Sequence, residues 1–253
     1  MYLVVSTDKT YNSIKIRRVL YPYNTFNCVF KIKLDDCMEM IGVVMGQHPT
    51  GDNMKKIFHI TDKNMINAVL DKAEYGTLAV CNENIPYAVP LNFVRIEENI
   101  YFHGALKNKK MKMIEQNPHA SFSVVESYSI IASFFSSSDG LACPATHFFK
   151  SVSIDGVAKV VQNREEKAMM FEAMMQKLQP EGGYKSFNDE AYDKALGATA
   201  VVKIVPSSMT CKFKFGQHLD KERFDMILEH LKERNTEIDN ETIEMMKGLK
   251  DGI

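Results

Sequence analysis

Four lysines lie within one short segment of the chain and could together bind an anion. Lys107, Lys109, Lys110 and Lys112 follow Gly104, which is expected to end the preceding strand in a bend. Ammonium groups at the start of a helix stand against the helix dipole, which is mildly unfavourable on its own. A bound anion would reverse that cost, because helix N-terminal N–H groups and lysines would both point at it. The segment therefore predicts a phosphate-binding site.

The residues that follow indicate the helix. Met111 and Ile114 are three positions apart and would share one helical face. The alternative is a solvated lysine face, which is the ordinary explanation of a run of charges. Spacing alone leaves both interpretations open.

The elements before this segment are expected to position it. Residues 87–94 and 100–105 are β-rich and flank a polar turn at 97–99, which predicts a hairpin. Upstream, Thr61 or Asp62 is expected to cap a helix that stops at Gly76 and is followed by a strand over 77–81. Pro90 lacks an N–H for a sheet ladder, so its strand is predicted to lie at an edge or a bulge.

Downstream, the pattern predicts further strands and helices. Residues 119–126 alternate as a strand, and 128–146 form a long excursion expected to serve as a lid or a dimer contact. Residues 148–161 predict a strand pair or one strand bent at Asp155-Gly156, and Asn163 is expected to cap a helix with a methionine stripe. Two strands over 199–205 and 209–215 and two terminal helices complete the chain.

The fold class predicted from these elements is α+β, with six to seven antiparallel strands in a small β-barrel and flanking and C-terminal helices. Three regions are expected: residues 1–53 as an N-terminal extension of uncertain structure, 54–218 as the barrel, and 219–253 as helices packed on it. Within the extension, short β-like runs at 2–5, 28–34 and 40–45 show no helical period. The extension is predicted to be absent from the native product; the alternative is that it adds a strand or two packed on the barrel.

Composition describes an ordinary globular chain. Hydrophobic residues make up 45% and charged residues 25% of its 253 positions, and the formal net charge is −1. That charge gives no global attraction to nucleic acid or anionic membranes. Five widely spaced cysteines include no CxxC pair, so neither a zinc site nor a disulfide framework is indicated. The chain shows no secretory signal or membrane span, and a cytoplasmic location is expected.

Three further motifs accompany the lysine segment, and together the four resemble one family. The stretch IYFHGALKNKKMKMI followed by NPHASFSV is similar to the core motif of the FMN-binding split-barrel family related to pyridoxamine 5′-phosphate oxidase, and within it to the nitroimidazole-resistance (Nim) reductase-like branch. The other matches lie at Pro86, Tyr87, Val89, Pro90, Leu91 and Asn92, at Phe149, Ser151, Val152 and Gly156, and at Lys214 and Gln217. The resemblance covers roughly residues 54–246.

This resemblance implies an FMN-binding homodimer with the flavin at the subunit interface. The family's basic pair at the helix start grips the FMN phosphate, which maps to Lys109 and Lys110, and its histidine position maps to His103. Asn108 stands where the family prefers glycine, and the turn is expected to survive because asparagine tolerates left-handed backbone angles. The implied cofactor-binding residues are Val89, Pro90, Leu91, Asn92, Phe102, His103, Gly104, Lys109, Lys110, Ser151, Lys214 and Gln217, and His103 is the implied catalytic residue.

The implied function is that of a nitroreductase-like oxidoreductase, which passes electrons from NAD(P)H through FMN to a small acceptor such as a nitroaromatic or quinone. Three alternatives stay open: a non-catalytic flavin-binding or flavin-sensing protein, a haem-handling split barrel, and a nucleic-acid regulator that uses the lysines. The last is disfavoured because few aromatic residues are interleaved with them. Oxidation of pyridoxamine phosphate itself is also disfavoured, since the arginine-rich C-terminal substrate motif is missing. For His103 the competing interpretation is a ring satisfied by the barrel backbone.

Overall fold

The computed structural model describes residues 3–8, 13–18 and 54–251. The chain divides into two compact units, Met1–Asn53 and Met54–Ile253. In the first unit, strands β1 (Leu3–Asp8) and β2 (Ser13–Arg18) pair antiparallel. The strands expected over 28–34 and 40–45 lie outside the described residues.

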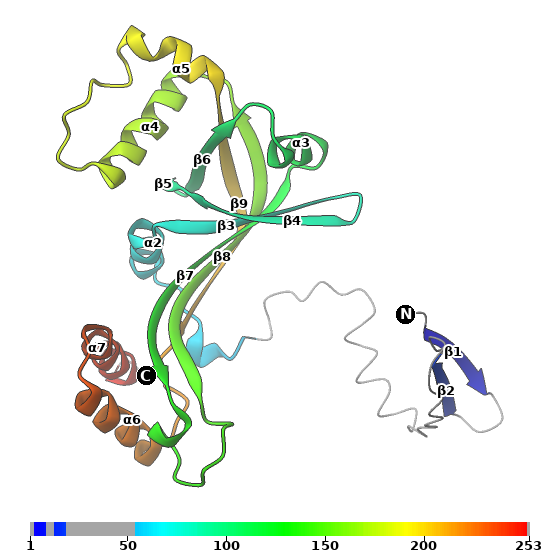
Figure 1. Ribbon diagram of the computed structural model, residues 1–253, viewed down its shortest axis with the longest axis vertical. Coiled ribbons are helices and arrows are strands. Elements are labelled where there is room, and N and C mark those ends of the chain that lie inside the picture. The colour runs from blue at the N-terminus through cyan, green and yellow to red at the C-terminus, as the bar shows by residue number, and fades with distance from the viewer. Residues whose placement is uncertain (1–2, 9–12, 19–53, 252–253) are drawn as a thin grey trace, which may run out of the picture. The chain divides into compact units, whose positions relative to one another are not determined.

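The second unit is built on one seven-stranded antiparallel sheet (Figure 1), whose strand order is β4-β3-β7-β8-β9-β6-β5. The seven strands with their flanking helices confirm the predicted α+β class. Their bounds are β3 Tyr75–Asn82, β4 Ile85–Asn92, β5 Val94–Ile96, β6 Asn99–Ala105, β7 His119–Ile131, β8 Thr146–Val161 and β9 Thr199–Lys214.

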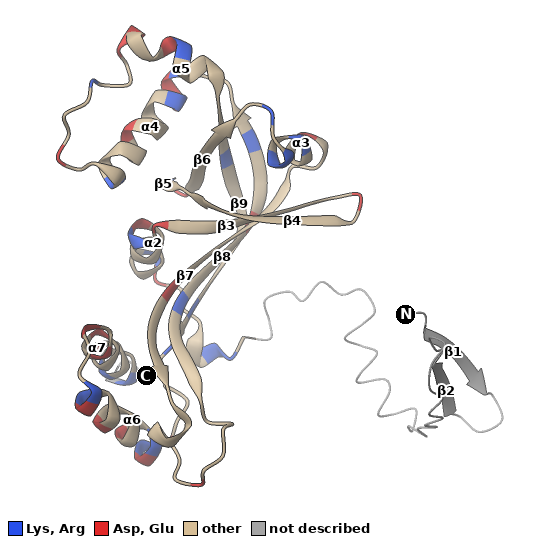
Figure 2. Cartoon of the chain, in the orientation of Figure 1, with Lys and Arg blue, Asp and Glu red and all other residues tan. Residues whose placement is uncertain are grey.

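Helices surround the sheet and carry many of the charged side chains (Figure 2). Four of the α-helices are capped at their N-terminus by a side-chain oxygen: Asp62 accepts from Met65 N, Asn108 from Met111 N, Asn163 from Glu166 N, and Asp220 from Arg223 N. Such caps satisfy N–H groups that have no partner inside the helix. The bounds are α2 Lys63–Lys72, α3 Lys109–Gln116, α4 Arg164–Leu178, α5 Asp193–Ala198, α6 Lys221–Arg234 and α7 Glu237–Asp251, with short 3₁₀ turns at Lys56–Phe58, Ser133–Phe135 and Glu190–Tyr192.

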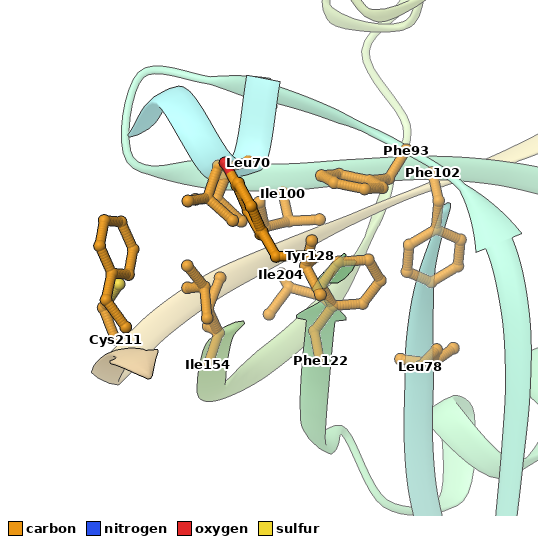
Figure 3. Close-up of a cluster of buried hydrophobic side chains, with 14 of the residues drawn as sticks. Leu70, Leu78, Phe93, Ile100, Phe102, Phe122, Tyr128, Ile154, Ile204 and Cys211 are labelled. Atoms are coloured by element: carbon orange, nitrogen blue, oxygen red, sulfur yellow. The ribbon is translucent and has the colours of Figure 1, made fainter. Parts of the chain in front are cut away.

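The main core lies on the inner face of the sheet (Figure 3). Strand alternation places Phe122 of β7 and Val202 of β9 in it, at no more than 1% exposure. The neighbouring Val201 faces the other way and joins a second cluster with Met170 and Met174 of α4. Helix α4 therefore covers part of the opposite face of the sheet. Its predicted methionine stripe is confirmed as packing at Met170 and Met174, whereas Leu178, the last residue on the same helical face, is exposed.

Strand pairing corrects the predicted hairpin. Residues 85–92 form β4, which pairs with β3 rather than with the strand over 99–105. The short β5 is the partner that meets β6 through the predicted polar turn, where Glu97 has φ of 55°. Strand β4 is an edge strand, as Pro90 predicted.

The prediction that Gly76 ends a helix was wrong. Helix α2 ends at Lys72, and Gly76 lies inside β3, opposite Leu91 of β4. A Cβ at Gly76 would lie 2.1 Å from the ring of Phe122, which fills the core below it. Close packing against an aromatic ring, and not backbone freedom, explains this glycine.

Two predicted strands near the C-terminus are one. Strand β9 is one strand over Thr199–Lys214, and it pairs with residues 149–161 of β8. The register shifts at Asp155/Gly156, as the bent-strand interpretation of this segment predicted, and a Cβ at Gly156 would lie 2.3 Å from Val205 O. The predicted excursion is shorter than expected, because β7 continues to Ile131.

Candidate functional site

The predicted helix begins at Lys109 and is capped by the residue that departs from the family pattern. The side chain of Asn108 accepts a hydrogen bond from Met111 N at 2.9 Å, and its Nδ2 donates to Ala105 O at 2.8 Å. The φ of Asn108 is −151°, so the expected left-handed turn is wrong. Asparagine is suited to this position because it is a strong N-cap residue.

The two lysines of the predicted phosphate site lie over neighbouring elements. Lys109 Nζ lies 4.4 Å from the ring centre of Tyr87 in β4, within cation–π range. Lys110 folds back over β6. Its Nζ lies only 2.8 Å from the position that a Cβ on Gly104 would occupy. The expected bend at Gly104 is wrong, since β6 continues through it opposite Ala200. This glycine instead gives Lys110 room to approach the strand.

His103 lies on β6 next to Gly104, over which Lys110 of α3 folds, and its side chain is exposed. Partial desolvation, followed by the charge on Lys110, holds the pKa of His103 below its ordinary value. The imidazole is therefore neutral at pH 7, with one nitrogen able to donate and the other to accept. Within residues 54–251, no protein group hydrogen-bonds this ring, which argues against the interpretation that the barrel backbone satisfies it.

An aromatic stack that sequence reasoning missed adjoins His103. The ring of His103 lies 5.2 Å from that of Phe171 in α4. Phe171 stacks on Phe187 at 5.3 Å and 15°, and Phe187 stacks on Tyr192 at 4.3 Å and 21°. Isolated aromatic residues in a segment rich in glycine and polar residues were the only available signal. The stack forms an apolar wall on one side of the histidine.

The residues predicted on β4 divide by what their side chains do. Val89 and Leu91 pack partly against the main core, and Pro90 is exposed on the outer face of the edge strand. Asn92 Nδ2 donates to Glu74 O at 3.1 Å and holds the start of β3. Phe102 on β6 is fully buried, so it offers a ligand only its backbone.

The remaining predicted residues lie elsewhere in the subunit. Gln217 is 4% exposed, and its amide is used by the backbone: Oε1 accepts from Phe215 N at 2.8 Å and Nε2 donates to Phe213 O at 2.9 Å. Lys214 Nζ donates to the hydroxyl of Thr146. Ser151 lies opposite Lys212 in the β8–β9 ladder.

The sheet register shows how far the residues around His103 lie from those around Lys214. His103 lies opposite Val201 at the start of β9, whereas Lys214 ends the same strand thirteen positions later. At about 3.3 Å per residue, this corresponds to roughly 40 Å of strand. Helix α3 lies toward one end of β8 and β9, and α6 lies toward the other (Figure 1). One subunit therefore brings together Lys109, Lys110, His103 and Tyr87, but not Lys214, Gln217 or Ser151.

Comparison with known protein families identifies the family of this chain. The family model described as pyridoxamine 5′-phosphate oxidase matches residues 62–213. The chain belongs to this family. The match spans β3 to β9 and α2 to α5, and so includes every residue of the site around α3. A search of curated protein sequences found no match.

Solved structures similar to this family member share its fold. A proposed 5-nitroimidazole antibiotic resistance protein from Bacteroides thetaiotaomicron is 21% identical with a TM-score of 0.50, over 61% of this chain and 85% of that one. The flavocytochrome Anf3 from Azotobacter vinelandii is 20% identical with a TM-score of 0.55, over 65% and 74%. An FAD and haem binding protein from Mycobacterium smegmatis is 18% identical with a TM-score of 0.51, over 62% and 73%. The predicted split barrel is thereby confirmed.

In the described part of this family member, none of the helices combines the length and apolarity needed to cross a lipid bilayer.

Proposed function

We propose that this protein is a cytoplasmic FMN-dependent oxidoreductase that passes electrons from NAD(P)H to a small organic acceptor such as a nitroaromatic or a quinone. The observation that carries the proposal is the cluster at the start of α3, where two lysines and a capped helix N-terminus adjoin a neutral histidine. Family membership and the names of two similar structures, a flavocytochrome and an FAD and haem binding protein, support a flavin as the ligand.

The donors at this site fit a flavin phosphate. Lys109 and Lys110 bring two ammonium groups, and the first-turn N–H groups of α3 are oriented along the helix axis. Lys110 reaches the site because Gly104 has no side chain. A single phosphate matches one such cluster, which is why we favour FMN over FAD. Mass analysis of the released chromophore decides between them.

When bound, a flavin supplies hydride acceptance from a nicotinamide and electron transfer to the acceptor. The protein's part is to bind, orient and exclude water. Neutral His103 would donate one hydrogen bond to a polar group of cofactor or substrate; burial, and after it the charge of Lys110, lowers the pKa of this imidazole. The stack of Phe171, Phe187 and Tyr192 offers a planar acceptor an apolar surface, which supports an aromatic or quinone substrate.

The proposed enzyme is a homodimer with flavin at the interface. Ser151 lies too far from Lys109 to meet the same flavin within one subunit. A second copy in antiparallel arrangement would bring its Ser151 toward the first copy's α3. We expect the flavin-loaded protein to sediment at twice the 28.8 kDa chain mass. A monomer that keeps its flavin would contradict the shared site.

Replacing His103 by alanine is expected to lower turnover with little loss of flavin. The lysines that hold the phosphate are unchanged, whereas the hydrogen bond to the reacting region is lost; a positioned proton donor typically contributes about 10²–10⁴-fold to rate. The measurement is steady-state NADH and NADPH oxidation with a nitroaromatic and a quinone, alongside flavin content. His119→Ala, an exposed histidine at the start of β7, is the matched control.

Two results would contradict this part of the proposal. Unchanged turnover in His103→Ala would remove the residue from the mechanism. No acceptor-dependent turnover in the wild-type protein would favour a flavin-storing or flavin-sensing role instead.

Haem binding is a second candidate, because a neutral, exposed imidazole such as His103 is also a common axial ligand to haem iron. A Soret band in the purified or haem-titrated protein that is lost in His103→Ala would favour it over the flavin enzyme.

A further inference from the structure

A small pocket lies at the end of the second unit far from α3. It occupies about 220 Å³ between the loop that follows the Ser133–Phe135 turn, the end of β9 and the first turn of α6. Pockets for drug-sized ligands measure roughly 300–1,000 Å³. This one therefore suits a small ion or the end group of a larger ligand, and not a whole flavin.

The ionisable side chains that line the pocket are mostly basic. Lys214, His218 and Arg223 contribute to its wall, and no aspartate or glutamate does. The ion pairs that α6 makes within the described part of the chain use Lys221, His230 and Arg234, and not Arg223. Burial, together with the positive charges of Lys55, Lys214, Arg223 and Lys250, lowers the pKa of His218. The pocket thus has a positive potential.

Three carboxylates line a neighbouring hollow and are not part of the pocket's own lining. Asp139, Asp220 and Glu222 line a neighbouring hollow that shares Arg223 and Ser136 with the pocket. Asp220 is already engaged, because its side chain caps α6 by accepting from Arg223 N at 2.9 Å. The pocket's own lining therefore contains basic side chains and no carboxylate, which favours an anion as its ligand.

The cations are held in place before any ligand binds. Arg223 Nε donates to Ser136 O at 3.1 Å, which fixes the guanidinium against the loop. Lys214 Nζ donates to the hydroxyl of Thr146, and the ring of His218 packs edge-on against Phe58 at 5.2 Å. Prior ordering of this kind lowers the entropic cost of binding. Guanidinium and ammonium groups that converge on one small space are the usual partners of phosphate.

We propose that this pocket binds a phosphate-type anion, either free or as the end group of a larger ligand, and that it is separate from the site at the start of α3. It lies at the opposite end of β9 from His103. The inference goes beyond the proposed flavin chemistry, and it rests on its own residues.

The test is calorimetric titration of inorganic phosphate into the full chain at constant ionic strength. The Lys109→Ala/Lys110→Ala background removes the α3 site first. We expect phosphate to bind saturably to the Lys109→Ala/Lys110→Ala protein. Adding Arg223→Gln to that protein is expected to lower its affinity for phosphate at least tenfold. Lys232→Gln removes the same charge from an exposed position near the other end of α6 and is expected to change nothing.

Three results would overturn the proposal: no saturable binding in that background, equal binding in Arg223→Gln, or loss of binding in flavin-loaded wild-type protein. The last would mean that the pocket takes a flavin phosphate. If thermal unfolding shows that Arg223→Gln is not folded, Lys214→Met supplies the same comparison, since methionine is an unbranched side chain only one atom shorter than lysine and carries no charge. A folded Lys214→Met variant that binds phosphate as tightly as its background would also overturn the proposal.

Discussion

Replacing Lys109 and Lys110 together by alanine is expected to weaken flavin binding by about 3–6 kcal/mol, because a hydrogen bond to a charged group contributes roughly 1.5–3 kcal/mol. Since about 1.4 kcal/mol is a tenfold change, the dissociation constant should rise by roughly 10²–10⁴. Fluorescence titration of the flavin-free protein with FMN measures this change. Helix α3 should survive, because its cap comes from Asn108 and its buried side chains are Met111, Met113 and Ile114.

The matched control removes the same charge from the same segment. Lys107 and Lys112 are both exposed. Their double alanine variant should bind flavin with an affinity within a few-fold of that of the wild-type protein. The salt dependence of its flavin affinity should change only as expected for the loss of exposed surface charges. Full flavin content in the Lys109/Lys110 variant would show that these lysines do not hold the flavin. Equal losses in both variants would show that the lysines act only through general surface charge.

Replacing Arg234 by alanine is expected to cost about 3–5 kcal/mol of folding stability, since it leaves a buried charge without its partner. The Asp239 side chain is fully buried. Its carboxylate accepts hydrogen bonds from Arg234 Nε at 2.8 Å and from Arg234 Nη2 at 2.5 Å. Ser129 Oγ on β7 also donates to it at 2.5 Å, and Arg234 Nη1 donates to Ile130 O at 3.0 Å. This network attaches the turn between α6 and α7 to the sheet.

Urea unfolding at pH 7 measures the loss. Lys221→Ala breaks an exposed pair with Asp225 on the same helix and is the control, because a solvent-exposed ion pair contributes little to folding stability. Equal, small losses in both variants would show that the Arg234–Asp239 network does not hold the helices to the sheet.

The same network predicts how stability depends on pH. Hydrogen bonds from Arg234, then those from Ser129 and Thr236, hold the pKa of Asp239 well below its usual range. A depressed carboxyl pKa adds stability above the unfolded value of about 3.9 and loses it as pH falls toward the folded value. The wild-type protein should therefore lose stability below about pH 4, and Asp239→Asn should show a shallower dependence in that range.

Local signals explain why much of the fold was predictable. Caps at Asp62 and Asn163, the apolar face of α3 and the edge position of Pro90 each depend on a few neighbouring residues. The lysines at the helix start were recognisable for the same reason. The Asn108 cap shows the limit, because one residue type serves both a left-handed turn and a helix cap, and only the backbone φ distinguishes them.

The sequence by itself determined the order and type of most elements, the family and the lysine cluster at the start of α3, because hydrophobic period, caps and motifs depend on short stretches of chain. Only the tertiary structure decided that β4 pairs with β3, that Phe187 reaches Phe171, that Gln217 serves the backbone, and that Lys214 lies a strand's length from His103. These depend on contacts between residues far apart in sequence. Such contacts are set by how the whole core packs, and no local pattern records them.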